Sequence, residues 1–302
     1  MRFNFLLLVI FLTSNCFAGE INFTQEEIIY GRKDGMALTM VKLSPDKING
    51  KAIINVVSGN FISSMEKLPG YIKSSMIYLE RGYTVFIVVH GSQPKYTIPE
   101  AFSDVRRAIR YVRFNSDKYK INKNLIGITG ASAGGNLALL CALADDNIEF
   151  KKKDSVDEVS SRVKAVACFF PPTDFINYGK ENPQNKINED FLRFANVAAA
   201  FDFKTWDNKN KVFVSITNDS ERIEKAKEVS PVYYVTSDDP PVLLIHGNKD
   251  MLVPLQQSTT LMEKLKDANV KSELIIKDGK GHGWNDNEDD LIKIANWFDT
   301  YL

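Results

Sequence analysis

The chain has 302 residues, of which 44% are hydrophobic and 25% are charged. These values are typical of globular proteins, and they exclude a disordered chain. Lysine and arginine together number 38, as do aspartate and glutamate. This balance excludes the strongly basic chain of many nucleic-acid-binding proteins, so we expect no nucleic-acid partner.

The first residues have the pattern of a secretory signal peptide. Arg2 precedes a short apolar run over residues 5–12, and small residues follow up to Gly19. The run is shorter than the ~20 residues that span a bilayer, so no stable membrane insertion is expected. We predict that residues 1–18 are removed and that the mature domain, residues 19–302, is secreted or periplasmic.

The three cysteines bear on both export and metal binding. A lipoprotein anchored at Cys16 is the alternative to cleavage, but Thr13 occupies the position where such signals usually carry an aliphatic residue. Cys141 and Cys168 lie in apolar runs, which predicts buried free thiols rather than a disulfide. There is no CxxC pair and there are only three histidines, so we expect no metal and no cofactor.

Segments rich in β-branched and aromatic residues alternate with helical patterns along the chain. The expected strands cover residues 27–30, 37–42, 52–57, 83–89, 125–129, 163–170, 241–246 and 271–277. The expected helices cover residues 71–81, 99–114, 134 onward, 258–269 and 291–302. The first two strands form a hairpin, and the later alternation predicts a doubly wound, mostly parallel sheet covered by helices.

Residues 174–230 have a different composition, rich in Asn, Lys and Glu with scattered aromatic side chains. We interpret this segment as a helical cap excursion that is inserted between two strands and lies over an edge of the sheet.

A candidate nucleophile stands at the end of the strand over residues 125–129. Gly130-Ala131-Ser132-Ala133-Gly134 matches G-x-S-x-G between a strand and a helix, the context that this motif requires. Small neighbours permit the sharp turn that exposes the serine, and the helix N-terminus offers N–H groups to an oxyanion. The competing interpretation is that Ser132 only caps the helix.

A serine hydroxyl needs a base, and His282 is the best candidate among His90, His246 and His282. His282 follows the strand over residues 271–277 and is flanked by glycines. His90 precedes Ser132, against the expected order of serine, acid and histidine. His246 ends an apolar strand, which indicates a satisfied, partly buried side chain.

Asp250 follows the strand over residues 241–246, where the acid that orients the histidine is expected. The competing interpretation is a turn aspartate. Asp278 is a minor rival, and Asp238 and Asp239 precede the strand and so lie at its wrong end.

Taken together, these segments resemble the α/β-hydrolase superfamily, and within it the bacterial acetyl esterase and feruloyl-esterase-like branch related to the hormone-sensitive-lipase group. The resemblance extends from Ala52 to Leu302. The motifs that carry it are Pro99-Glu100-Ala101-Phe102-Ser103-Asp104 with Ala108, residues 127–138, Ser230-Pro231, residues 240–247, Asp250 and Gly281-His282-Gly283.

The chain departs from this family at two places. Family members usually carry His-Gly-Gly-Gly after the strand over residues 52–57, and its N–H groups form the oxyanion hole. Here the sequence reads Val57-Ser58-Gly59-Asn60-Phe61, so the expected donors are Gly59 and Asn60, joined by Ala133. In addition, His90-Gly91 replaces the Tyr-Arg that is common in the family.

The resemblance implies an α/β-hydrolase fold and a serine hydrolase that cleaves carboxylic esters through Ser132, Asp250 and His282. Its expected partner is a small-molecule or polysaccharide ester, such as an acetyl or feruloyl group on carbohydrate. A serine peptidase of the prolyl-oligopeptidase type is an alternative, but the residues before Ala52 have no room for the β-propeller of those enzymes. A non-catalytic binding protein is the third interpretation, because the glycine-rich oxyanion loop is missing.

Overall fold

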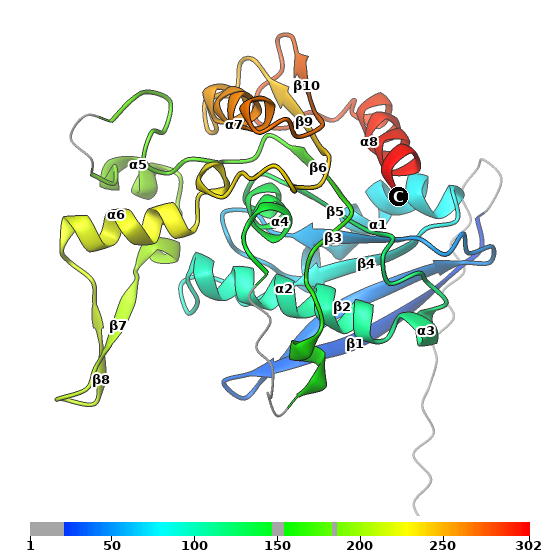
Figure 1. Ribbon diagram of the computed structural model, residues 1–302, viewed down its shortest axis with the longest axis horizontal. Helices are drawn as coiled ribbons and strands as arrows, with labels where there is room; N and C mark the ends of the chain where they lie inside the picture. Colours follow the sequence, from blue (N-terminus) through cyan, green and yellow to red (C-terminus); the bar gives the residue numbers. More distant parts are fainter. Residues whose placement is uncertain (1–20, 147–153, 183–185) are drawn as a thin grey trace, which may run out of the picture.

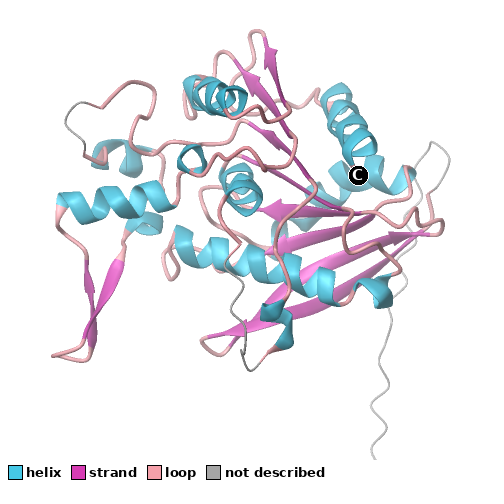
Figure 2. Ribbon diagram, viewed as in Figure 1, coloured by secondary structure: helices cyan, strands magenta, loops and turns pink. Residues whose placement is uncertain are grey.

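The computed structural model describes residues 21–146, 154–182 and 186–302, and an eight-stranded sheet runs through them (Figures 1 and 2). Its strand order is β1-β2-β4-β3-β5-β6-β9-β10. Within this sheet, only the β1–β2 and β2–β4 pairs are antiparallel. The strands are β1 (Phe23–Lys33), β2 (Met36–Pro45), β3 (Ala52–Val57), β4 (Thr84–Val89), β5 (Ile126–Ala131), β6 (Ala165–Phe169), β9 (Val242–Gly247) and β10 (Ser272–Lys277).

Helices cover both faces of this sheet, and the predicted architecture is confirmed. One face packs on α1 (Leu68–Glu80) and α8 (Glu288–Tyr301). The other packs on α2 (Ile98–Phe114), α4 (Ala133–Leu143) and α7 (Gln256–Asp267). The central strand β3 is buried throughout and apolar except for Asn55, whose side-chain amide donates to Ser75 Oγ at 3.2 Å.

Local sequence signals fix where these helices begin. Thr97 and Glu100 form a capping box at the start of α2, and Pro99 lies in its first turn. The helix α8 begins three residues before the predicted start, because the acidic residues of its first turn favour the helix N-terminus.

The segment between β6 and β9 leaves the sheet, as expected of a cap, but it is not wholly helical. It contains α5 (Glu189–Phe194), η3 (Ala198–Phe201), β7 (Lys204–Asp207), β8 (Val212–Ser215) and α6 (Asp219–Glu228). The helical expectation fails over residues 204–215, where β7 and β8 form an antiparallel hairpin. The cause is local, because β-branched and aromatic residues flank an Asn-rich turn.

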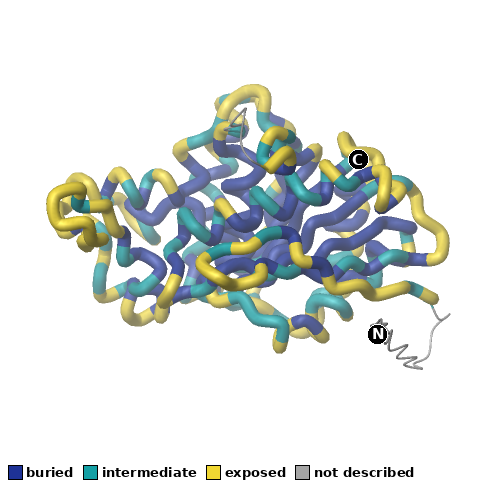
Figure 3. Tube along the Cα trace, turned by 90° about the horizontal axis from the view of Figure 1, so that it is seen from below, coloured by how far each residue is buried: buried dark blue, intermediate teal, exposed yellow. Residues whose placement is uncertain are grey.

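Burial differs sharply between the sheet and this excursion. Figure 3 shows the inner strands of the sheet buried and the outer end of the excursion exposed. Cys141 and Cys168 are buried free thiols, and burial raises the pKa of Cys141 to about 12. The predicted signal peptide and Cys16 lie outside the described residues. Within those residues, no helix is both long and apolar enough to cross a membrane.

Candidate active site

Ser132 stands in the turn that joins β5 to α4, at the carboxyl end of the sheet. Its backbone has φ 54° and ψ −123°, a strained conformation that presents the side chain at the top of the turn. The turn requires glycine on both sides. A Cβ at Gly130 would lie 2.4 Å from the Gly134 carbonyl, and one at Gly134 would lie 2.7 Å from the Val56 carbonyl.

The structure brings Ser132 together with the other two predicted residues. His282 Nε2 lies 2.9 Å from Ser132 Oγ, and His282 Nδ1 lies 2.7 Å from Asp250 Oδ2. A carboxylate only accepts, so Nδ1 carries the proton and Nε2 is free to accept from the serine hydroxyl. This arrangement can pass a proton from Ser132 to His282.

Asp250 is buried, and its second oxygen is held by the main chain. Oδ1 accepts from the amides of Leu252 and Val253 at 2.9 and 2.8 Å. Burial raises the pKa of the Asp250 carboxyl, but hydrogen bonds from His246, His282 and Val253 outweigh it and hold the pKa well below its ordinary value. The carboxylate therefore stays ionised and oriented.

The other candidate residues, His90, His246 and Asp278, form no hydrogen bond with Ser132 among the described residues. His246 is fully buried, with Nε2 2.8 Å from the Val253 carbonyl and Nδ1 2.7 Å from Ser258 Oγ. It also approaches Asp250 Oδ2 at 3.3 Å, so it supports the acid, a contact that sequence reasoning did not find. His90 is buried, and its Nδ1 lies 2.7 Å from the carbonyl oxygen of Gly91. Asp278 accepts a hydrogen bond from the side chain of Asn248.

The loop after β3 forms a tight turn from Gly59 to Ile62. Asn60 and Phe61 have φ of 53° and 58°, the positive values of a type I′ turn, and Gly59 and Ile62 exchange two hydrogen bonds. The Gly59 amide donates to the Ile62 carbonyl at 3.0 Å, so its prediction as an oxyanion donor is wrong. Among the described residues, the amides of Asn60 and Phe61 donate to no acceptor.

Ala133 contributes the other predicted donor. It is the first residue of α4, so its amide has no acceptor within the helix. Asn60 and Ala133 line one narrow pocket with Ser132, so the structure brings two of the three predicted donors to the candidate nucleophile.

The rest of this pocket is apolar and is contributed largely by the segment between β6 and β9. Tyr178 and Phe191 contact each other there, with ring centroids 4.2 Å apart. The ring of Phe170 packs on His282 at 4.6 Å between centroids, and its φ of 33° marks a strained backbone. No sequence motif predicted Phe170, and the Pro171 that follows it favours an extended backbone rather than this conformation.

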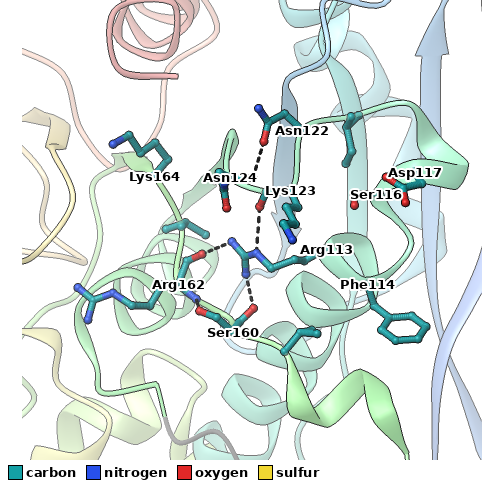
Figure 4. Close-up of a pocket in the computed structure, with 13 residues that line it drawn as sticks. Arg113, Phe114, Ser116, Asp117, Asn122, Lys123, Asn124, Ser160, Arg162 and Lys164 are labelled. Atoms are coloured by element: carbon teal, nitrogen blue, oxygen red, sulfur yellow. Dashed lines mark hydrogen bonds between the residues drawn. The ribbon is translucent and has the colours of Figure 1, made fainter.

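A larger hollow lies at the opposite, amino end of β5 and β6 (Figure 4). Its central cation, Arg113, points into a ring of backbone carbonyls. Nε donates to Lys123 O at 3.0 Å, and the two Nη atoms donate to Ser160 O and Arg162 O. Because these bonds occupy the guanidinium, we assign Arg113 a structural role and place the active site at the carboxyl end.

Comparisons with known proteins agree with this architecture. The BD-FAE family model matches residues 42–265. The chain is 25% identical over 234 residues to esterase LipC of Mycobacterium tuberculosis, covering 77% of this chain and 53% of that protein. It is 29% identical over 248 residues to esterase LipQ of the same organism, covering 81% and 53%. The chain thus spans about half the length of these curated relatives.

A solved structure of a truncated carbohydrate esterase from gut microbiota superimposes with a TM-score of 0.70. It is 23% identical in sequence, and the match covers 94% of this chain and 98% of that chain. This likeness confirms the predicted α/β-hydrolase fold.

Proposed function

The chain belongs to the BD-FAE family, and on that premise we propose that it is an exported serine carboxylesterase acting on small acyl esters of carbohydrate. The observation that carries the proposal is the hydrogen-bonded chain from Ser132 through His282 to Asp250. The names of the similar esterases and of the carbohydrate esterase support the reaction and the substrate class. The signal-like residues 1–18 support export.

The reaction proceeds through an acyl-enzyme. Ser132 Oγ attacks the ester carbonyl as His282 Nε2 takes its proton, and Asp250 stabilises the imidazolium that forms. The amides of Asn60 and Ala133 donate to the oxyanion. His282 then returns the proton to the leaving alcohol. Water, activated by the same imidazole, attacks the acyl carbon and releases the acid.

The pocket beside Ser132 favours a short acyl group. It is narrow, and apolar side chains from Phe175, Tyr178, Phe191 and Leu252 close it. An acetyl group fits such a site better than a long chain or a bulky feruloyl group, so acetyl esters are the preferred substrates of this proposal.

The test is hydrolysis of p-nitrophenyl acetate, butyrate and octanoate by the mature protein, with acetylated xylan and methyl ferulate as carbohydrate and feruloyl substrates. We expect the acetate to be preferred, and Ser132→Ala to lower kcat at least ~10³-fold. A fluorophosphonate should label the wild type at Ser132 and leave Ser132→Ala unlabelled. Wild-type protein that neither hydrolyses an ester nor accepts the label would favour the binding-protein interpretation.

A further inference from the structure

The side chain of Gln93 joins two parts of the molecule that are far apart in sequence. It lies in the loop between β4 and α2, and it is 9% exposed. Its Nε2 donates to the carbonyls of Asn60 at 2.5 Å and Asn196 at 2.8 Å. Its Oε1 accepts from the amide of Ala200 at 3.1 Å. One amide therefore contacts both the turn beside Ser132 and the segment around η3.

These partners fix the orientation of the Gln93 amide. Asn60 and Asn196 present carbonyl oxygens, which only accept, whereas Ala200 presents an N–H, which only donates. Three of the four hydrogen bonds available to a glutamine amide are thus satisfied in one orientation. The opposite orientation would set donor against donor and acceptor against acceptor.

The main chain of the same loop holds the turn at its other carbonyl. The Gln93 amide donates to the Phe61 carbonyl at 3.2 Å. One residue earlier, Ser92 Oγ accepts from the Ser63 amide at 2.7 Å and donates to the Ser63 carbonyl at 2.9 Å. The carbonyls of Asn60 and Phe61 are therefore both fixed, whereas the amides of these two residues donate to no acceptor among the described residues.

We propose that Gln93 is a positioning residue that ties the segment around η3 to the oxyanion turn, holds the Asn60–Phe61 peptide and so keeps the turn that carries the Asn60 amide in place beside Ser132. The inference rests on the proposed esterase function. Both central residues of the turn have positive φ without being glycine, so the turn is strained and needs external support. Gln93 supplies that support through one buried amide.

Two substitutions distinguish the effect of the hydrogen bonds of Gln93 from the effect of its side-chain volume. Gln93→Met keeps the length of the side chain and removes every polar atom. Gln93→Glu keeps an acceptor for Ala200 and lacks the two donors to Asn60 and Asn196, so it remains informative if the methionine variant does not fold. The matched control is Gln257→Met, because Gln257 is a fully buried glutamine that instead binds the amides of Thr173 and Asp174.

We expect kcat on p-nitrophenyl acetate to fall ~10–100-fold in both Gln93 variants, with KM changed less than about twofold. The inhibition constant of a trifluoromethyl ketone, whose adduct carries an oxyanion, should rise by the same factor, whereas butyrate binding should not change. Gln257→Met should lower the melting temperature and leave kcat within about twofold of the wild type.

Three results would overturn the inference. They are a folded Gln93 variant with wild-type kcat, a kcat loss with no change in ketone inhibition, and an equal kcat loss in Gln257→Met. Wild-type protein that lacks both ester hydrolysis and fluorophosphonate labelling would instead contradict the proposed function, so the two failures are distinguishable.

Discussion

The two ends of the parallel strands carry two hollows of opposite character. At the amino end, the larger hollow contains Arg113, whose guanidinium donates to three backbone carbonyls. At the carboxyl end, the pocket is narrow and mostly apolar, yet Asn60 and Ala133 line it beside Ser132, and the amides of both donate to no acceptor among the described residues. In this molecule, amides without an acceptor among the described residues mark the candidate active site, whereas the size of a hollow does not.

Backbone strain also differs between the carboxyl and amino ends of the parallel strands. Ser132, Asn60, Phe61 and Phe170 all have positive φ, and all lie at the carboxyl end. Near the amino-end hollow, Lys120 also has a positive φ of 55°, but it is an exposed residue that ends the short helix α3 (Ser116–Tyr119), an ordinary use of this conformation. Strained, partly buried non-glycine residues gather where the proposed chemistry occurs.

The largest effect should come from the acid at the carboxyl end. In Asp250→Asn, the amide can no longer stabilise the imidazolium or fix the tautomer of His282 through Nδ1–H. We expect kcat on p-nitrophenyl acetate to fall about 10³–10⁴-fold, with fluorophosphonate labelling slowed in parallel.

The control for this substitution is Asp278→Asn. Asp278 is also an aspartate after a strand of the same sheet, but it accepts from Asn248, and among the described residues the carboxylate that His282 binds is that of Asp250. Its kcat should stay within about twofold of the wild type. Equal losses in the two variants would mean that Asp250 is not the acid.

A smaller effect, on stability rather than activity, should come from the amino end. Arg113→Met leaves the carbonyls of Lys123, Ser160 and Arg162 without their donor. Because water reaches part of this open hollow, we expect a loss of about 2–3 kcal/mol in the free energy of unfolding, measured by urea denaturation. The kcat of the folded fraction should not change.

Arg162→Met is the matched control at the same edge. Its guanidinium forms a largely exposed ion pair with Asp238, so the free energy of unfolding should change by less than about 0.5 kcal/mol. If Arg113→Met instead lowers kcat more than it lowers stability, the division of roles between the two ends is wrong.

Much of the arrangement at the carboxyl end could be predicted from the sequence, because short local motifs determine it. The G-x-S-x-G turn needs small residues around Ser132, and Asp250 and His282 each follow an apolar strand. Parallel strands bring such positions to one edge of the sheet. These three residues could therefore be identified without knowledge of how side chains pack.

The remaining features depend on contacts between distant segments. The Gly59 amide donates to Ile62 through a turn with two non-glycine residues at positive φ, a conformation that asparagine tolerates but that the bulky side chain of Phe61 disfavours. Gln93 reaches Asn196 and Ala200 more than 100 residues away. Only tertiary structure reveals these relations.

The smallest expected effect concerns Asp146, after the C-terminus of α4, where Arg106, Arg110 and Ser161 contact its carboxylate. Burial raises the pKa of Asp146, but hydrogen bonds from Ser160, Ser161 and Arg110 outweigh it and lower the pKa to about 2. Its stabilising contribution is therefore present above the unfolded pKa of about 3.9 and is lost as the pH falls toward 2.

Asp146→Asn should then cost about 1–2 kcal/mol in the free energy of unfolding at pH 7, after allowance for solvent screening, and less at pH 3. Urea denaturation of both proteins at pH 7, 5 and 3 measures this difference. Asp190→Asn is the control, because that side chain is 97% exposed and should matter little at any pH. A difference that stays constant from pH 7 to 3 would mean that Asp146 stabilises the fold through packing. A difference that shrinks would add the paired charge of Asp146 to the hydrogen-bonded groups that distinguish this end of the molecule from the carboxyl end, where the proposed chemistry occurs.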